Sequence, residues 1–194
     1  RGEVHIVEPD LDKIVHDAVA EGKLRAATEP EPADAFIIAV PTPFTEITRA
    51  GMVVSSKGVV FGAGSPTMAA SVMYHELAGG QTESLRRTSD AEVDDGYVSA
   101  PRSIEFPTER GLTAHAFFYP PKNRDYAAPE DKRPPLLVMS HGGPTGTTSS
   151  TLNLNVQYWT SRGIAVLDVN YGGSSGYGTE YRRRLNGQWG VVDI

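Results

Sequence analysis

The residues with the greatest chemical potential lie between positions 141 and 176. A His-Gly-Gly triplet occupies positions 141–143, and Gly172-Gly-Ser-Ser-Gly176 formally matches the Gly-x-Ser-x-Gly pattern that presents a nucleophilic serine. Glycines let a backbone approach a ligand closely, and an exposed N–H at such a place can face a developing negative charge. The two motifs therefore raise two possibilities, a serine nucleophile and a backbone donor to an anion.

Two short apolar runs must position these motifs. Residues 136–140 end directly in the His-Gly-Gly triplet, and residues 163–171 end directly in the glycine-rich segment, with a helix-length segment between the two runs. Short apolar runs bounded by turn residues predict parallel strands joined by a crossover helix. This is the arrangement expected of an α/β-hydrolase, in which a His-Gly-Gly loop after the third strand supplies one oxyanion donor.

The two blocks together, spaced by Gln157-Tyr-Trp-Thr-Ser-Arg-Gly163, resemble the start of the catalytic domain of the prolyl oligopeptidase family. The resemblance covers residues 45–194 and is nearest to the acylaminoacyl and dipeptidyl peptidase branch. It implies a serine peptidase that acts on peptides, with the N–H of Gly143 as an oxyanion donor and His141 in a supporting role in the same loop. The simpler alternatives are that Gly143 serves only turn geometry and that His141 is a hydrogen-bonded histidine at a strand end.

The Gly-x-Ser-x-Gly match itself is interpreted as a decoy. The resemblance places it in the loop after the fourth strand, before the nucleophile. Hydrolase triads run serine, acid, histidine, but no histidine follows His141, and the only carboxylates after Ser174 are Glu180 and Asp193. We therefore expect that Ser174 is not the nucleophile, that the chain stops before the triad, and that it is inactive alone.

Residues 1–44 have a different character. Asp10 is a candidate N-cap for a helix with apolar residues at helical spacing, Gly22 is a stop signal, and an apolar strand at 35–40 ends in Pro41-Thr-Pro43. This segment resembles UDP-N-acetylmannosamine dehydrogenases, which implies a place for Thr42 near a nicotinamide cofactor. The Gly-x-Gly-x-x-Gly turn that holds the pyrophosphate is absent, so we expect no bound NAD and no other cofactor. An NAD-dependent dehydrogenase fragment and a non-catalytic module stay open as alternatives to the peptidase.

The middle of the chain predicts β-structure. Short strand candidates at 52–54, 59–61 and 71–74, with a hairpin at 79–80, suggest the last blade of a β-propeller, and residues 88–99 suggest a polar linker. Runs at 104–106 and 112–119 predict an antiparallel hairpin that begins the hydrolase sheet. The expected fold class is α/β, in three parts. These are a Rossmann-like fragment at 1–44, a blade fragment at 45–98 and a partial α/β-hydrolase domain at 99–194, and the join near 41–47 suggests a chimera.

Composition limits the remaining classes of function. Of the 194 residues, 39% are hydrophobic and 22% charged, which allows a packed core, and the net charge of −6 without a basic stripe argues against nucleic acid as a partner. The absence of cysteine excludes disulfides, and no apolar run is long enough to suggest a membrane span. We expect no metal site, because the histidines are scattered, Asp168 and the Asp94-Asp95 pair lack partners at ligand spacing, and residues 182–184 suggest a solvated arginine face. The cellular location is left open, with the cytoplasm favoured over other compartments, and the oligomeric state is left open too.

Overall fold

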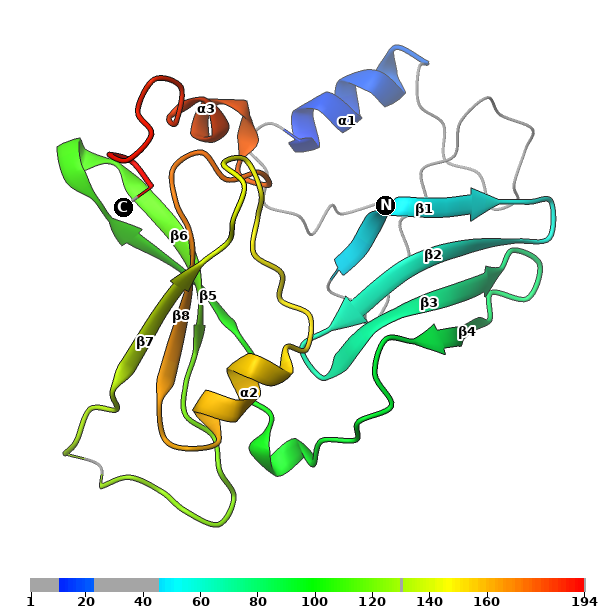
Figure 1. The fold of residues 1–194 in the computed structure, drawn as a ribbon. Helices are drawn as coiled ribbons and strands as arrows, with labels where there is room; N and C mark the ends of the chain where they lie inside the picture. The colour runs from blue at the N-terminus through cyan, green and yellow to red at the C-terminus, as the bar shows by residue number, and fades with distance from the viewer. Residues whose placement is uncertain (1–10, 23–45, 130, 194) are drawn as a thin grey trace. The chain divides into compact units, whose positions relative to one another are not determined.

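A computed structural model describes residues 11–22, 46–129 and 131–193 (Figure 1). The chain separates into two compact units, Arg1–Pro41 and Thr42–Ile194. In the first unit the described part is helix α1 (Leu11–Ala20), which ends in a turn at Gly22 with φ of +70°. The predicted helix and its glycine stop are confirmed. The predicted N-cap Asp10, the predicted strand at 35–40 and Thr42 lie outside the described residues.

The second unit begins with an antiparallel sheet in the order β1-β2-β3-β4. Its strands are β1 (Glu46–Val54), β2 (Gly58–Ser65), β3 (Met68–Glu76) and β4 (Thr82–Arg87). The three strand candidates and the turn at 79–80 are confirmed, but β4 was missed. All six β4 residues are exposed, so the strand has no apolar side to reveal it in the sequence.

A second, mixed sheet follows, in the order β5-β6-β8-β7. The strands are β5 (Arg102–Pro107), β6 (Thr113–Tyr119), β7 (Leu136–Ser140) and β8 (Ala165–Asn170). β5 pairs with β6 and β6 with β8 in antiparallel fashion, whereas β7 and β8 are parallel and helix α2 (Leu154–Thr160) lies between them in the sequence. The predicted hairpin and the strand–helix–strand crossover are therefore both confirmed.

Helix α2 covers one face of this second sheet (Figure 1). Asn153 caps the helix by accepting a hydrogen bond from the N–H of Asn155 at 3.0 Å, which satisfies one of the donors that a helix start leaves free. Tyr119, Val156 and Val166 form the buried cluster between helix and sheet. Burying a valine side chain stabilises a fold by about 1.5–3 kcal/mol, so this small cluster fixes how α2 docks.

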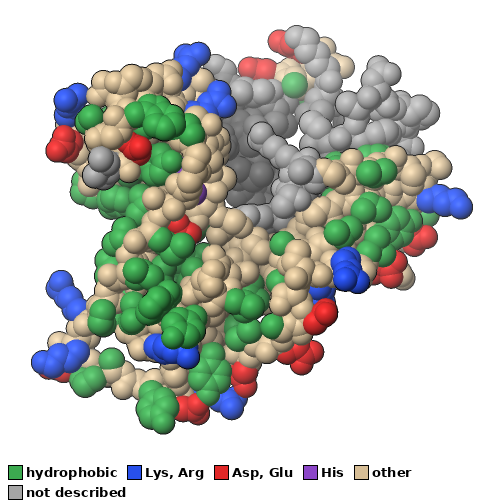
Figure 2. Space-filling view, viewed as in Figure 1, with side chains coloured by type: hydrophobic (Ala, Val, Ile, Leu, Met, Phe, Trp, Pro, Cys, Tyr) green, Lys and Arg blue, Asp and Glu red, His purple; other side chains and the backbone are tan. Residues whose placement is uncertain are grey.

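Strand β7 is one of the two outer strands of the second sheet, the other being β5, and β8 is its ladder partner among the described residues. Leu136 and Val138 are 52% and 59% exposed, and Figure 2 shows hydrophobic side chains at the surface in this part of the molecule. The edge strand thus presents alternate apolar side chains to solvent.

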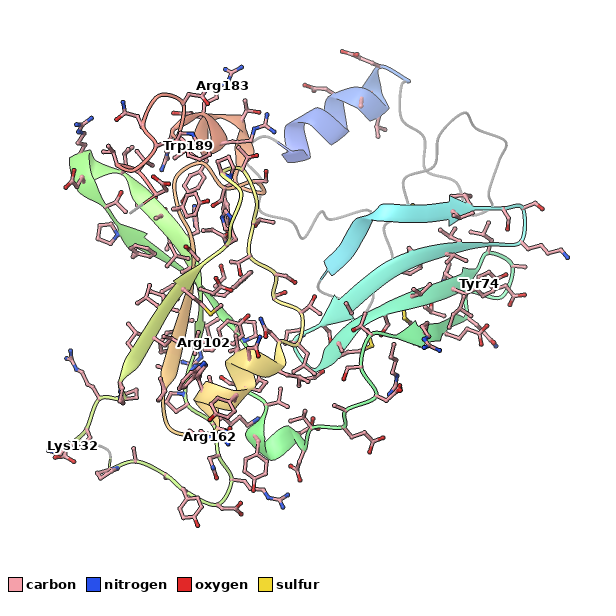
Figure 3. All side chains as sticks on the ribbon, viewed as in Figure 1. Tyr74, Arg102, Lys132, Arg162, Arg183 and Trp189 are labelled. Carbon is pink, nitrogen blue, oxygen red and sulfur yellow. The ribbon has the colours of Figure 1, made fainter. Side chains whose placement is uncertain are left out.

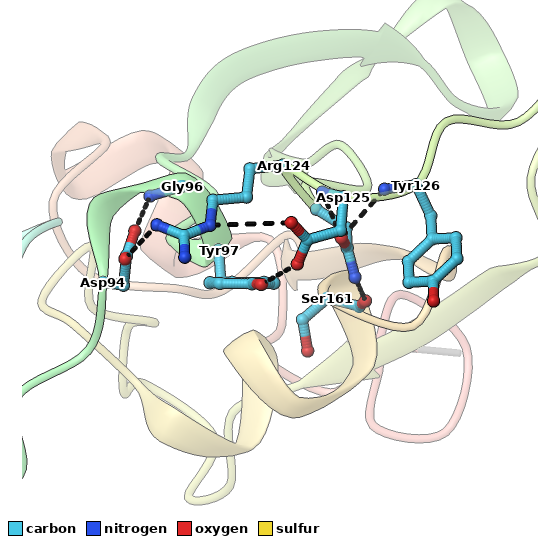
Figure 4. A network of polar contacts seen from close by, with 8 residues as sticks. Asp94, Gly96, Tyr97, Arg124, Asp125, Tyr126 and Ser161 are labelled. Atoms are coloured by element: carbon cyan, nitrogen blue, oxygen red, sulfur yellow. Dashed lines mark hydrogen bonds and ion pairs between the residues drawn. The ribbon is translucent and has the colours of Figure 1, made fainter.

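The polar segment between the two sheets is anchored to the second one (Figure 4). Asp94 caps the short 3-10 helix η1 (Asp95–Tyr97) and pairs with Arg124, while the hydroxyl of Tyr97 donates to Asp125. The ion pair of Asp94 with Arg124 is a contact that the sequence did not suggest. Ser99 follows, and it exchanges hydrogen bonds of 2.7 and 3.2 Å with Gln157 of α2.

A second 3-10 turn, η2 (Glu109–Gly111), closes the hairpin between β5 and β6. After β8, the chain forms helix α3 (Gly178–Arg183). The prediction of a solvated arginine face is wrong for Arg184. Its guanidinium donates to the carbonyl of Thr113 at 2.8 Å and lies 4.4 Å from the ring centre of Tyr181. Arg183, by contrast, points away from the helix (Figure 3).

Candidate functional site

The ends of β7 and β8 bring the two glycine-containing motifs together. The strands are parallel and in register, with Ser140 beside Val169, so the segments that follow them leave the same edge of the sheet. One segment is residues 141–146, and the other is residues 171–175. These two segments contact each other closely, and we call residues 141–146 and 171–175 together the two-loop clamp.

The ring of His141 lies between side chains of the other loop. Its Nε2 is 2.7 Å from the Oγ of Ser174, and its ring stacks on that of Tyr171 with centres 4.5 Å apart. The hydroxyl of Ser174 also lies 2.8 Å from the carbonyl oxygen of Tyr171, to which it donates. Ser174 is fully buried, so its oxygen faces protein groups and not solvent.

Ser175 ties the loops together a second time. Its N–H donates to the carbonyl of Gly146 at 2.8 Å, and its hydroxyl donates to the carbonyl of Thr145 at 2.7 Å. Within the first loop, the N–H of Gly146 donates to the carbonyl of Gly143 at 2.8 Å and closes a turn. The first loop is thus held both by its own turn and by the second loop.

Gly143 has a backbone that few other residues adopt. Its φ is +66°, in the left-handed region, and no atom lies within 4 Å of the place where a Cβ would be. The angle, and not crowding, is what requires a glycine there. Gly143 is exposed, and among the described residues no acceptor receives its N–H. An exposed, unpaired N–H on a firmly held loop is a suitable donor to an anion.

Two buried polar side chains of β8, Asp168 and Asn170, form hydrogen bonds with the residues that directly follow the first loop. Asn170 accepts hydrogen bonds from the N–H of Thr148 at 2.9 Å and from the hydroxyl of Thr147 at 3.0 Å, and Asp168 accepts one from the hydroxyl of Thr148. Burial raises the pKa of the Asp168 carboxyl, while the Thr148 hydrogen bond and the nearby His141 act in the opposite direction. Asn170 was missed in the sequence, although polar residues at every second position of an apolar strand are a signal for such a pair.

Aromatic rings hold the segment that follows the second loop against β6. The ring of His115 stacks on Tyr177 with centres 4.1 Å apart, and burial lowers the pKa of this histidine. The hydroxyl of Tyr177 accepts a hydrogen bond from Asn170 at 3.0 Å, and that of Tyr181 donates to the Asn170 carbonyl at 2.7 Å. His115 is therefore a packing residue of this site.

An apolar cavity of about 470 Å³ lies on the second sheet, beside the clamp. Its lining comes from the β5–β6 hairpin, the ends of β7 and β8, and the C-terminal segment, and includes Phe106, Met139, Tyr171 and Val192. Among the residues that the structure describes, no group of three or more potential ligands could hold a metal ion. None of the described helices has the length and apolarity that a membrane crossing needs.

The sequence-predicted residues therefore fall into two sets. The structure brings His141, Gly143 and Ser174 together in one site, with Asp168 close by. It separates His75, which contacts Thr82 in the first sheet at 2.8 Å, from the others. Thr42 lies outside the described residues.

Two family models match different parts of this chain. Residues 1–58 match the NAD binding domain of the UDP-glucose/GDP-mannose dehydrogenase family, and residues 150–194 match the prolyl oligopeptidase family. At the N-terminus, an NDP-N-acetyl-D-galactosaminuronic acid dehydrogenase of Ralstonia nicotianae is 70% identical over 46 residues, which are 24% of this chain and 11% of that protein. A UDP-N-acetyl-D-mannosamine dehydrogenase of Yersinia pestis is 68% identical over 44 residues, 23% of this chain and 10% of that protein.

Solved structures match the larger part of the chain. A puromycin-hydrolyzing peptidase of Mycobacterium tuberculosis is 43% identical with a TM-score of 0.75, over 78% of this chain and 23% of that one. An acylaminoacyl peptidase of Pyrococcus horikoshii shares the fold at 20% identity and a TM-score of 0.54, over 74% of this chain and 22% of that one. The chain thus spans about a quarter of these peptidases and about a tenth of the dehydrogenases. The chain is therefore similar to UDP-sugar dehydrogenases at its N-terminus and, over a longer segment, to peptidases of the prolyl oligopeptidase family, the S9 serine peptidases.

Proposed function

We propose that residues 99–194 form the first part of the α/β-hydrolase domain of a serine peptidase. Residues 45–98 then correspond to the last blade of a β-propeller, and residues 1–44 to a Rossmann-like fragment joined to them in a chimera. The identity of 43% to a puromycin-hydrolyzing peptidase supports the larger assignment, as does the β5-β6-β8-β7 strand order. The dehydrogenase matches over 44–46 residues support the smaller one.

The observation that carries the proposal is the exposed N–H of Gly143. In acyl transfer a nucleophile adds to the scissile carbonyl, and the carbonyl oxygen becomes negative in the transition state. A fixed N–H directed at that oxygen stabilises the charge more strongly in the transition state than in the substrate. We assign this role to Gly143, with His141 as a supporting residue of the same loop.

The nucleophile, the acid and the catalytic histidine are proposed to come from residues other than those of this chain. Ser174 is buried and hydrogen-bonded on both sides, which leaves no approach for a substrate carbonyl. His141 is the last histidine in the sequence. On this proposal the chain alone binds no covalent serine inhibitor, and the complete peptidase cleaves peptides or aminoacyl amides near their amino end.

A fluorophosphonate probe tests the proposal in two samples. The first is this chain, which we expect to stay unlabelled. The second is this chain extended with the remaining catalytic residues of the puromycin-hydrolyzing relative, which we expect to be labelled and to hydrolyse an aminoacyl anilide. Stoichiometric labelling of Ser174 in the first sample would overturn the assignment. An inactive but folded second sample would contradict the peptidase role.

We propose no cofactor role for Thr42 or its neighbours. In the sequence given, the dehydrogenase-like segment contains no glycine-rich turn of the kind that binds a pyrophosphate. Calorimetry with NAD should show no saturable heat at millimolar concentration. A dissociation constant of ~1 mM or below, about −4 kcal/mol, would favour the dehydrogenase alternative.

A further inference from the structure

We propose that Ser174 is a positioning residue for the oxyanion donor, acting through the ring of His141. This inference rests on the proposed function for its catalytic consequence, but its structural part concerns this chain alone. The Gly-x-Ser-x-Gly match then has a use unlike the one its pattern suggests. The serine orients a loop and does not attack a substrate.

The first step follows from counting protons. The Ser174 hydroxyl has one proton, and it faces two groups, the Tyr171 carbonyl at 2.8 Å and Nε2 of His141 at 2.7 Å. A carbonyl oxygen can only accept, so the hydroxyl proton goes to Tyr171. The serine oxygen must then accept from the ring, which makes Nε2 of His141 the protonated nitrogen.

The second step links the ring to the peptide between Gly142 and Gly143. Nδ1 of His141 lies 3.2 Å from the carbonyl oxygen of Gly142. In the Nε2–H tautomer both of these atoms are acceptors, so the contact is not a hydrogen bond, and their repulsion keeps the carbonyl from turning toward the ring. That carbonyl and the N–H of Gly143 are opposite ends of one planar trans peptide, so neither can turn without the other. A ring held by Ser174 on one side therefore limits the direction of the Gly143 N–H on the other.

Crowding around the same peptide reinforces this limit. A Cβ at Gly146 would lie 2.8 Å from the Gly142 carbonyl oxygen and 2.9 Å from Nδ1 of His141, so the loop closes tightly on both. The stacked ring of Tyr171 covers another side of the imidazole, and its hydroxyl lies 3.5 Å from Nδ1. The ring can rotate little while Ser174 is hydrogen-bonded to Nε2. When that hydrogen bond is removed, the ring can turn over by rotation about the Cβ–Cγ bond of His141.

Nitrogen NMR of this chain tests the structural part directly. In alkaline buffer, long-range proton–nitrogen correlations should show His141 as the Nε2–H tautomer. Ser174→Ala should give a mixture of tautomers and a shifted Gly143 amide signal. Ser175→Ala is the matched control, because it removes the hydroxyl that reaches Thr145 and leaves the His141 contact in place. An Nδ1–H tautomer in the unaltered chain would overturn the proposal without any variant, as would an unchanged tautomer in a folded Ser174→Ala variant.

Gly146→Ala provides a second variant that keeps Ser174. Its added methyl group presses on the Gly142 carbonyl, so the Gly143 amide signal should move while His141 keeps the Nε2–H tautomer. No shift of that signal would mean that the peptide is not confined as described.

The catalytic part needs the extended protein. There Ser174→Ala should lower kcat by roughly 10- to 100-fold with little change in KM, because a displaced donor affects the transition state most. Ser175→Ala should lower kcat less. A Ser174→Ala variant with full kcat would refute the positioning role, whereas an inactive extended protein would refute the proposed function and leave the tautomer result standing.

Discussion

The two four-stranded sheets of the second unit differ in how the chain passes through them. In the first sheet every strand pairs with its neighbour in the sequence, and each connection is a tight turn. In the second sheet β8 is inserted between β6 and β7, and a helix lies between two parallel strands. The described buried polar side chains of the first sheet's strands are the hydroxyls of Ser65 and Ser71, whereas β8 of the second buries Asp168 and Asn170.

This difference teaches where chemistry can be built. In a meander, each strand is followed by a short turn that leads directly into the next strand. Such turns contain too few residues to form a site between them. Parallel strands end at the same edge and release two longer loops side by side, although here the two loops are about thirty residues apart in the sequence. The clamp between residues 141–146 and 171–175 exists because of that topology.

The largest expected effect comes from comparing Gly143, in the loop after β7 of the second sheet, with Gly80, in a turn of the first sheet. Proline at Gly143 would remove the N–H but cannot adopt a φ of +66°, and alanine would be strained there, so neither is a clean probe. Replacing Gly143 by glycolic acid, an ester of the same shape, removes the N–H alone. In the extended protein this change should lower kcat by ~10²–10³, about 3–4 kcal/mol, with KM little changed.

Two asparagine variants control for backbone shape in that experiment. Asparagine tolerates the left-handed region and keeps the N–H, so Gly143→Asn should retain most of the activity. Gly80→Asn makes the same change in the β3–β4 turn, where φ is +67°, and should leave kcat unaltered. A loss in Gly143→Asn equal to that of the ester would assign Gly143 to turn geometry only.

The next prediction concerns the stability of the two sheets and whether they unfold in one transition. Val59 of β2 and Val166 of β8 are 1% and 0% exposed. Alanine at either position should lower the free energy of unfolding by about 1.5–3 kcal/mol. Because the N–H of Leu152 donates to the carbonyl of Ser65 at 2.7 Å and so links the sheets, both variants should shift one common transition in urea. Two transitions, each moved by one variant, would show that the sheets are independent.

A smaller effect concerns Asp168, a buried carboxyl of the second sheet. Since burial raises the pKa of Asp168, the folded state binds more protons than the unfolded state as pH rises through the ordinary carboxyl range and above. Stability attributable to this group therefore falls as pH rises. Asp168→Asn keeps an acceptor for Thr148 and should raise the melting temperature at neutral pH by about 2–4 °C, equivalent to ~1 kcal/mol. Asp131→Asn, at an exposed site, is the control, and an equal gain there would reject the explanation.

The smallest effect has the opposite sign in pH. Burial lowers the pKa of His115, so the unfolded state binds more protons as pH falls below about 6.5, and stability is lost toward acid. His115→Phe keeps the stacking on Tyr177 and cannot be protonated. Its free energy of unfolding should fall less than that of the unaltered chain between pH 7 and pH 5, and the difference should be under about 0.5 kcal/mol. An identical acid loss in both proteins would exclude His115 as its source.

Much of the second sheet could be predicted because its signals are local. The apolar runs that became β7 and β8, and the turn between β5 and β6, are each visible within a few residues. β4 could not be found, since a fully exposed strand lacks apolar alternation. Arg184 was misassigned because its partner, Thr113, is 71 residues away in the sequence.

The candidate site was only half visible in the sequence. The residue types of His141, Gly143 and Ser174 stand out, and the order of groups argued against Ser174 as a nucleophile. Their mutual contact depends on the register of β7 against β8 and on the shape of two loops, which no local pattern encodes. Asn170, which accepts hydrogen bonds from Thr147 and Thr148, was missed although its alternation with Asp168 on an apolar strand is visible in the sequence.

The position of β7 at the outside of its sheet has a consequence for handling the protein. Its outward N–H and C=O groups, together with exposed Leu136 and Val138, can accept another extended chain, including one from an identical molecule. Association of that kind depends on concentration and raises the apparent melting temperature by mass action. Protein concentration is therefore an experimental variable here, and the melting temperatures of any two variants are comparable only at matched dilution.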